Sequence, residues 1–161
     1  MVEIFIKLIY NVVTRGIVMF LGEYKHQLDE KSRFRIPTSL KKELGSEYVI
    51  TKGMNGCLFV FSKNNLQNQF EEKLNNISLF DENAQRPLRL LFSSAFYVEE
   101  DSQGRVLMPK ALREFAGLEK NIVFLGVGSH VEIWSESNLQ KYNETNQSFD
   151  SVLKGLKEYG I

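Results

Sequence analysis

Two short stretches of the chain carry an aspartate and an arginine four residues apart, Asp29 with Arg33 and Asp101 with Arg105. An aspartate at the start of a turn can accept hydrogen bonds from loop amides and pair with the arginine that follows. The carboxylate then aims a guanidinium, a rigid fork of N–H donors that suits a phosphate or a guanine. The spacing therefore predicts two loops that each aim an arginine at such a group.

The residues around each loop predict the elements that position it. Each arginine begins a short apolar strand that stops at a proline, Pro37 or Pro109. Proline fits the first turn of a helix, because no N–H bond is lost there. Apolar residues then recur at helical spacing up to Gly45 or Gly117, each placed as a C-cap glycine would be. We expect a strand, a tight loop, a short strand and one amphipathic helix at both places.

These two stretches, residues 28–45 and 100–117, are copies of one unit. Five residues of the first stretch recur unchanged 72 positions later: Asp29, Arg33, Pro37, Leu40 and Gly45. An internal repeat at a fixed offset decides the architecture before any local pattern does. The chain is therefore predicted to hold two copies of a unit of roughly 50 residues.

Each copy continues into a hairpin and a helix. The hairpins are predicted at residues 48–61 and 122–134, with glycine in both turns. Ser62 is placed as the N-cap of a helix that runs to residue 76, and further helices are expected at 81–92 and 136–143. Residues 152–159 are expected to form a short amphipathic helix or to stay mobile.

The pattern D-x-x-x-R-φ-x-φ-P-x-x-L, present twice, resembles the AbrB-like (SpoVT/AbrB) swapped-hairpin DNA-binding family. A tandem form of this family begins with a sequence like MFLGEY, which stands at residues 19–24. The resemblance runs from residue 19 to about residue 142. It implies an α+β fold in which two pseudo-symmetric swapped-hairpin β-barrel repeats with short helices form one compact unit.

The same resemblance implies a sequence-specific transcriptional regulator that binds double-stranded DNA. Its expected target is the promoter of a division and cell-wall gene cluster, bound at repeated short boxes by a homo-oligomer, expected to be a ring. Arg33 is the strongest candidate for a base or phosphate contact. The expected DNA-binding residues are Lys25, His26, Lys31, Arg33, Arg35, Lys41, Lys42, Arg105 and Arg113, with Asp29 and Asp101 orienting the loops.

The two copies differ in charge. Residues 22–45 hold six basic and four acidic side chains, whereas residues 98–120 hold four basic and five acidic ones. Val98 and Glu114 stand where the family would have basic residues. We expect the first copy to hold DNA and the second mainly to complete the fold. The alternative is that the Asp–Arg pairs are only salt bridges that pin the loops, which the charges favour slightly for the second copy.

The composition excludes several classes of protein. Among 161 residues, 20 are basic and 20 acidic, which argues against a bulk nucleic-acid coat but not against a local basic patch. Cys57, the single cysteine, lies in an apolar run and is expected in the core, and His130 is expected on the surface of a hairpin. No stretch reaches the length of a membrane span. A glycine-rich phosphate loop, metal-ligand spacing and a nucleophile beside a base are all missing, so we expect no enzyme, no cofactor and no small-molecule substrate.

We divide the chain into an N-terminal extension (1–18), a first repeat (19–78), a helical linker (79–95), a second repeat (96–143) and a C-terminal tail (144–161). The apolar extension fits a start codon placed too early better than a weak signal peptide. A cytoplasmic, nucleoid-associated protein is expected. Two other functions stay open: a ring-forming interaction scaffold that does not bind DNA, and an AbrB-like antitoxin, for which a disordered toxin-binding tail is missing.

Overall fold

The computed structural model describes residues 18–144 and 147–159, so nearly all of the predicted N-terminal extension lies outside the described residues. The strands are β1 (Phe20–Gln27), β2 (Arg33–Phe34), β3 (Tyr48–Lys52), β4 (Leu58–Ser62), β5 (Phe96–Tyr97), β6 (Val106–Leu107), β7 (Asn121–Gly128) and β8 (Val131–Ser135). The helices are α2 (Thr38–Leu44), α3 (Lys63–Asn75), α4 (Glu82–Ser93), α5 (Lys110–Phe115), α6 (Glu136–Asn143), α7 (Phe149–Leu153) and the 3-10 helix η1 (Lys154–Tyr159).

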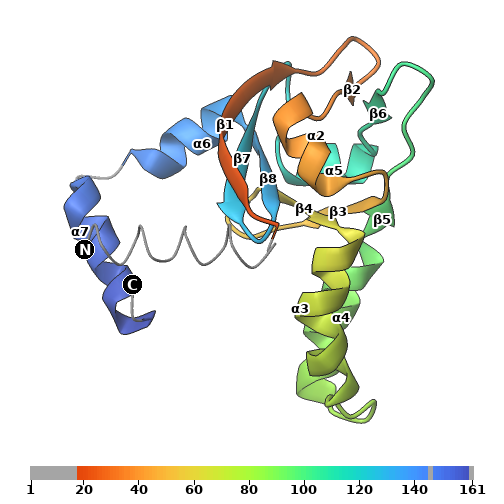
Figure 1. Ribbon diagram of the computed structural model, residues 1–161, viewed down its shortest axis with the longest axis vertical. Helices are drawn as coiled ribbons and strands as arrows, with labels where there is room; N and C mark the ends of the chain where they lie inside the picture. Colours follow the sequence, from red (N-terminus) through yellow and green to blue (C-terminus); the bar gives the residue numbers. More distant parts are fainter. Residues whose placement is uncertain (1–17, 145–146, 160–161) are drawn as a thin grey trace.

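The two repeats interleave strand by strand. An antiparallel sheet has the order β1-β7-β8-β4-β3-β5, and β2 pairs with β6 in a separate two-stranded ribbon (Figure 1). The pairs β1–β7, β3–β5, β4–β8 and β2–β6 each join one repeat to the other. The hairpins β3–β4 and β7–β8 stay within a repeat. The sheet order reads the same from both ends once matching strands are exchanged, which confirms two pseudo-symmetric swapped-hairpin repeats in one compact α+β unit.

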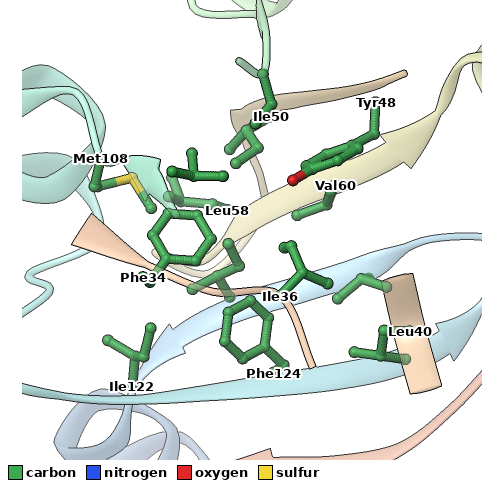
Figure 2. Packing of buried hydrophobic residues seen from close by; sticks show 14 of the residues in the cluster. Phe34, Ile36, Leu40, Tyr48, Ile50, Leu58, Val60, Met108, Ile122 and Phe124 are labelled. Carbon is green, nitrogen blue, oxygen red and sulfur yellow. The ribbon is translucent and has the colours of Figure 1, made fainter. Parts of the chain in front are cut away.

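A shared apolar core holds the ribbon against the sheet. Side chains alternate along a strand, so Phe34 and Ile36 of the first repeat point inward together with Val106 and Met108 of the second. Figure 2 shows Phe34, Ile36 and Met108 packed among residues of β4 and β7, and the rings of Phe34 and Phe124 lie 5.8 Å apart. Burial of apolar surface is the main favourable term in folding, and here both repeats supply it. The outward side chains of the ribbon are thereby fixed on the opposite side.

The helix after each ribbon strand confirms the sequence pattern closely. Pro37 and Pro109 occupy the N-cap positions of α2 and α5, one residue before the first turn where they were predicted. Gly45, the C-cap of α2, has φ 77°, and Gly117, just after α5, has φ 57°. Glycine tolerates this left-handed region, which ends a helix cleanly.

The second repeat departs from the first where a helical hairpin replaces half a strand. β1 has eight residues and β5 has two, and the positions that match the start of β1 lie at residues 92–95, around the end of α4. The Thr51 hydroxyl on β3 donates to the Leu91 carbonyl of α4 at 3.0 Å, so α4 covers the part of β3 that β5 leaves free. α3 begins at the predicted N-cap, where Ser62 Oγ accepts from the Asn65 amide. α3 and α4 project from the sheet at the end opposite the ribbon (Figure 1).

The sequence predicted a buried Cys57 and an exposed His130, and only the first prediction is confirmed. Cys57 is buried, as predicted. His130 was predicted on the surface, but its side chain is only 18% exposed, because its ring packs against the rings of Phe59 and Phe61, with centroids 4.4 and 5.2 Å away. β8 pairs with β4, which brings these aromatic side chains from the other repeat. Within residues 18–144 and 147–159, no group of three or more His, Cys, Asp or Glu side chains could hold a metal, and no helix is long and apolar enough to cross a membrane.

Candidate nucleic-acid interface

The first motif loop is organised by one carboxylate. Asp29 Oδ1 accepts hydrogen bonds from the Lys31 and Arg33 amides, both at 2.9 Å, and Oδ2 accepts from Arg33 Nε at 2.8 Å. The chain reverses at Ser32, whose φ of 58° lies in the left-handed region. The bonds from Arg33 lower the pKa of Asp29 to about 2, so the carboxylate is charged at neutral pH and holds the guanidinium in one direction.

The second loop repeats this geometry. Asp101 Oδ1 accepts from the Gln103 and Arg105 amides at 2.9 Å, Oδ2 accepts from Arg105 Nε at 2.7 Å, and Gly104 takes the left-handed position with φ 71°. The backbone hydrogen bond from Arg105, helped by its side chain, lowers the pKa of Asp101. Asp101 Oδ2 also lies 3.9 Å from Arg33 Nη1 of the first loop. One carboxylate therefore sits between guanidiniums of the two repeats.

The outward side of the ribbon collects three arginines, and we call Arg33, Arg35, Arg105 and Leu107 the ribbon face. Arg33 pairs with Leu107 across the two strands, and Arg35 Nε donates to the Gln103 carbonyl at 3.1 Å. The Arg33 and Arg105 side chains are 25% and 27% exposed, and Arg35 is exposed more fully. Such a face can donate several N–H groups to an anionic surface while its carboxylates keep the guanidiniums in place.

The structure does not gather all the predicted residues on the ribbon face. Lys31 is exposed in the first loop and Lys42 is exposed on α2. Lys25 lies on β1 and pairs with Glu136 at the start of α6 at 2.8 Å. His26, also on β1, is half-buried with its ring against Phe124 at 5.5 Å.

Two further residues predicted to bind DNA, Lys41 and Arg113, each bond a side chain of the other repeat. Lys41 of α2 bonds the carboxylate of Glu100, and Arg113 of α5 donates to the hydroxyl of Ser32. Sequence reasoning missed Glu100 and Ser32 as partners. Comparison of the repeats could have pointed to both partners. Glu100 matches Leu28 and Ser32 matches Gly104, and neither Leu28 nor Gly104 has a side chain that can accept a hydrogen bond.

Both Asp–Arg pairs are formed, so the salt-bridge interpretation applies to the two loops alike. It does not exclude a DNA contact, because about a quarter of each arginine side chain stays exposed. Exposed ion pairs contribute little to stability by themselves. Their clearest effect here is to orient the guanidiniums.

Two segments of the chain, residues 19–90 and 91–154, match the family model described as "MraZ protein, putative antitoxin-like". Similar curated proteins carry the name transcriptional regulator MraZ. One from Clostridium beijerinckii is 45% identical over 143 residues, and one from Clostridium acetobutylicum is 41% identical over 143 residues. One from Alkaliphilus oremlandii is 42% identical over 144 residues. Each alignment covers 89% of this chain and 100% of the relative.

Proposed function

The chain belongs to the MraZ family of transcriptional regulators, and from that premise we propose that it binds specific DNA through the ribbon face. Regulation of transcription, rather than catalysis, is what the names of its relatives state.

The observation that carries the proposal is the convergence of three arginines from two repeats on one exposed two-stranded ribbon. A two-stranded ribbon is narrow enough to enter the major groove of B-DNA. Arginine there can donate two parallel bonds to a guanine or hold a backbone phosphate. Since Asp29 and Asp101 orient two of these arginines beforehand, little side-chain freedom is lost on binding.

The first repeat contributes most of the proposed contacts. Arg33 and Arg35 read bases or phosphates, and the exposed Lys31 and Lys42 hold the phosphate backbone. The second repeat contributes Arg105. At the positions that match Arg35, Lys31 and Lys42 it has no cation, and the residues there are Leu107, Gln103 and Glu114.

We further propose that several copies act together as a homo-oligomeric ring on short boxes repeated in a promoter, that of a division and cell-wall gene cluster. The family resemblance supports the target and the ring. The physical reason for an assembly is that a single ribbon face carries few contacts. Linked binding events raise the overall affinity well above that of one contact.

The test is binding of the protein to a DNA fragment from upstream of its own gene, measured over a salt series. Arg33→Ala should weaken binding and reduce the slope of log K against log salt by about 0.9 per lost phosphate contact in each engaged copy. The matched control is Arg89→Ala, which removes an exposed arginine of α4 at the opposite end of the molecule. Equal losses for the two variants would place the contact elsewhere. A wild-type protein that binds no specific DNA would refute the proposal and favour the scaffold function.

A further inference from the structure

Each motif helix carries one cation that reaches the loop of the opposite repeat. Lys41 on α2 of the first repeat bonds Glu100, the residue that precedes the Asp101 loop of the second. Arg113 on α5 of the second repeat donates to Ser32, inside the Asp29 loop of the first. Lys41 and Arg113 occupy matching positions, 72 residues apart. The same crossing contact is therefore made twice, once in each direction.

The two contacts use different acceptors, because each acceptor is present in only one of the two repeats. The partner that would match Glu100 in the first repeat is Leu28, which has no acceptor and is buried. The partner that would match Ser32 in the second repeat is Gly104, which has no side chain. Each loop thus has one acceptor for a cation of the other repeat. In the second loop the acceptor is Glu100, just before Asp101, and in the first loop it is Ser32, the residue with the left-handed backbone.

The Lys41 contact lies at the edge of the core, with both charged side chains partly exposed beside the buried Tyr48. The Tyr48 hydroxyl donates to the same Glu100 oxygen at 2.5 Å, and Lys41 Nζ lies 4.7 Å from the centre of the Tyr48 ring. Lys41 and Glu100 side chains are 31% and 27% exposed, and Tyr48 is fully buried. Burial alone would raise the pKa of Glu100, but the bonds from Lys41 and Tyr48 outweigh burial and lower it. The carboxylate is therefore charged and held by two donors.

We propose that Lys41 and Arg113 are positioning residues, which fix the DNA-contacting loop of the opposite repeat and do not themselves bind phosphate. This inference rests on the proposed function and changes the role expected for both cations from the sequence. Each cation ties its helix to the other repeat's loop, so the spacing between Arg33 and Arg105 is held from both sides. We call the Lys41–Glu100 and Arg113–Ser32 contacts the crossed anchors.

The salt dependence of DNA binding separates positioning from phosphate contact. A lost phosphate contact reduces the slope of log K against log salt by about 0.9 per engaged copy. A lost anchor lowers affinity and leaves the slope as in the wild type. We expect Lys41→Met and Arg113→Met each to weaken binding by about tenfold, the size of a partly exposed charged hydrogen bond, with an unchanged slope. Slopes reduced by about one for both variants would overturn the inference.

A second experiment asks whether removing the charge of Glu100 strengthens or weakens DNA binding. If Lys41 bound phosphate, Glu100→Gln would free it and strengthen binding. If Lys41 is an anchor, Glu100→Gln weakens binding, although it removes a negative charge near DNA. Glu99→Gln is the matched control, because it removes the same charge from the exposed neighbouring residue. We expect weaker binding for Glu100→Gln than for Glu99→Gln, and the reverse order would overturn the anchor at Lys41.

Hydrogen exchange tests the anchors without DNA. Lys41→Met should speed hydrogen exchange of the Arg105 amide, in the opposite loop, more than that of the Arg33 amide. Arg113→Met should speed exchange of the Arg33 amide more than that of the Arg105 amide. Unchanged exchange in both loops, with wild-type DNA binding intact, would overturn the anchors alone. Absence of specific DNA binding by the wild type would instead refute the proposed function, and the positioning role would fall with it.

Discussion

Replacing Phe34 by alanine tests whether the two repeats form one cooperative unit. Phe34 lies in β2 of the first repeat, is 2% exposed, and packs against Phe124 of the second repeat. Truncation of a buried phenylalanine to alanine costs 3–5 kcal/mol through lost burial and the cavity left behind. We therefore expect a loss of about 4 kcal/mol, a large part of the roughly 5–15 kcal/mol that stabilises a typical domain. The melting temperature should fall by roughly 8–16 °C.

The assay is urea unfolding at one protein concentration, followed by tryptophan fluorescence and by far-ultraviolet circular dichroism. Trp134, the single tryptophan, is buried in β8 of the second repeat, whereas the substitution lies in the first. Since the strand pairs cross between repeats, both signals should shift together to the same lower midpoint. Leu107→Ala, on the same ribbon but 61% exposed, should change stability by no more than about 0.5 kcal/mol.

The result that would refute this reasoning is a fluorescence midpoint that stays at the wild-type value while circular dichroism shows an earlier, separate transition. The second repeat would then fold without the first. The interleaved sheet would not be the unit of stability.

Three further predictions concern single residues. The pKa of Asp29 is lowered from 3.8 to about 2, chiefly by the hydrogen bond from the Arg33 side chain, so the stability carried by this loop is complete above pH 3.8 and is lost as pH falls toward 2. Asp29→Asn should therefore flatten the pH dependence of the urea midpoint over that window, and a curve parallel to the wild type would contradict the prediction. Burial raises the pKa of the Cys57 thiol to about 12, so a thiol reagent at pH 8 should label the folded protein far more slowly than the urea-unfolded protein; equal rates would argue against a buried thiol. A methyl group at Gly126 would lie 2.3 Å from the Leu21 amide nitrogen of β1, so Gly126→Ala should push β1 away from β7 and lower the melting temperature by several degrees. Gly155→Ala is the control, because Gly155 has open space around it, and it should leave the melting temperature unchanged. An unchanged melting temperature for Gly126→Ala would contradict the close packing of β1 on β7.

The local parts of the fold could be predicted because their causes lie close together in the sequence. An aspartate four residues before an arginine, a proline before a helix and a glycine after it each act within a few residues. The offset of 72 residues then placed each of these features a second time. Ser62 and its helix followed from the same kind of local signal.

The parts that could not be predicted depend on which strands meet. His130 follows a Gly-Ser turn in the sequence, and its ring is covered by Phe59 and Phe61 only because β8 pairs with β4. Lys41 and Lys42 are adjacent in the chain, yet the fold turns Lys41 toward Glu100 and leaves Lys42 exposed. A count of basic residues treats both alike. The partner of a charge is set by tertiary structure, and composition does not contain it.

The unequal lengths of β1 and β5 make the two ends of the molecule different. A dimer of identical repeats looks the same when it is turned end over end, so its natural target is a palindrome. In this chain α4 replaces half of one edge strand, and Leu107 stands where the other repeat has Arg35. A copy laid backwards on DNA would offer a different set of side chains. In the DNA-bound assembly proposed above, neighbouring copies can therefore all face one way along the double helix, with the front of each against the back of the next. Two identical chains related by a twofold axis cannot do this.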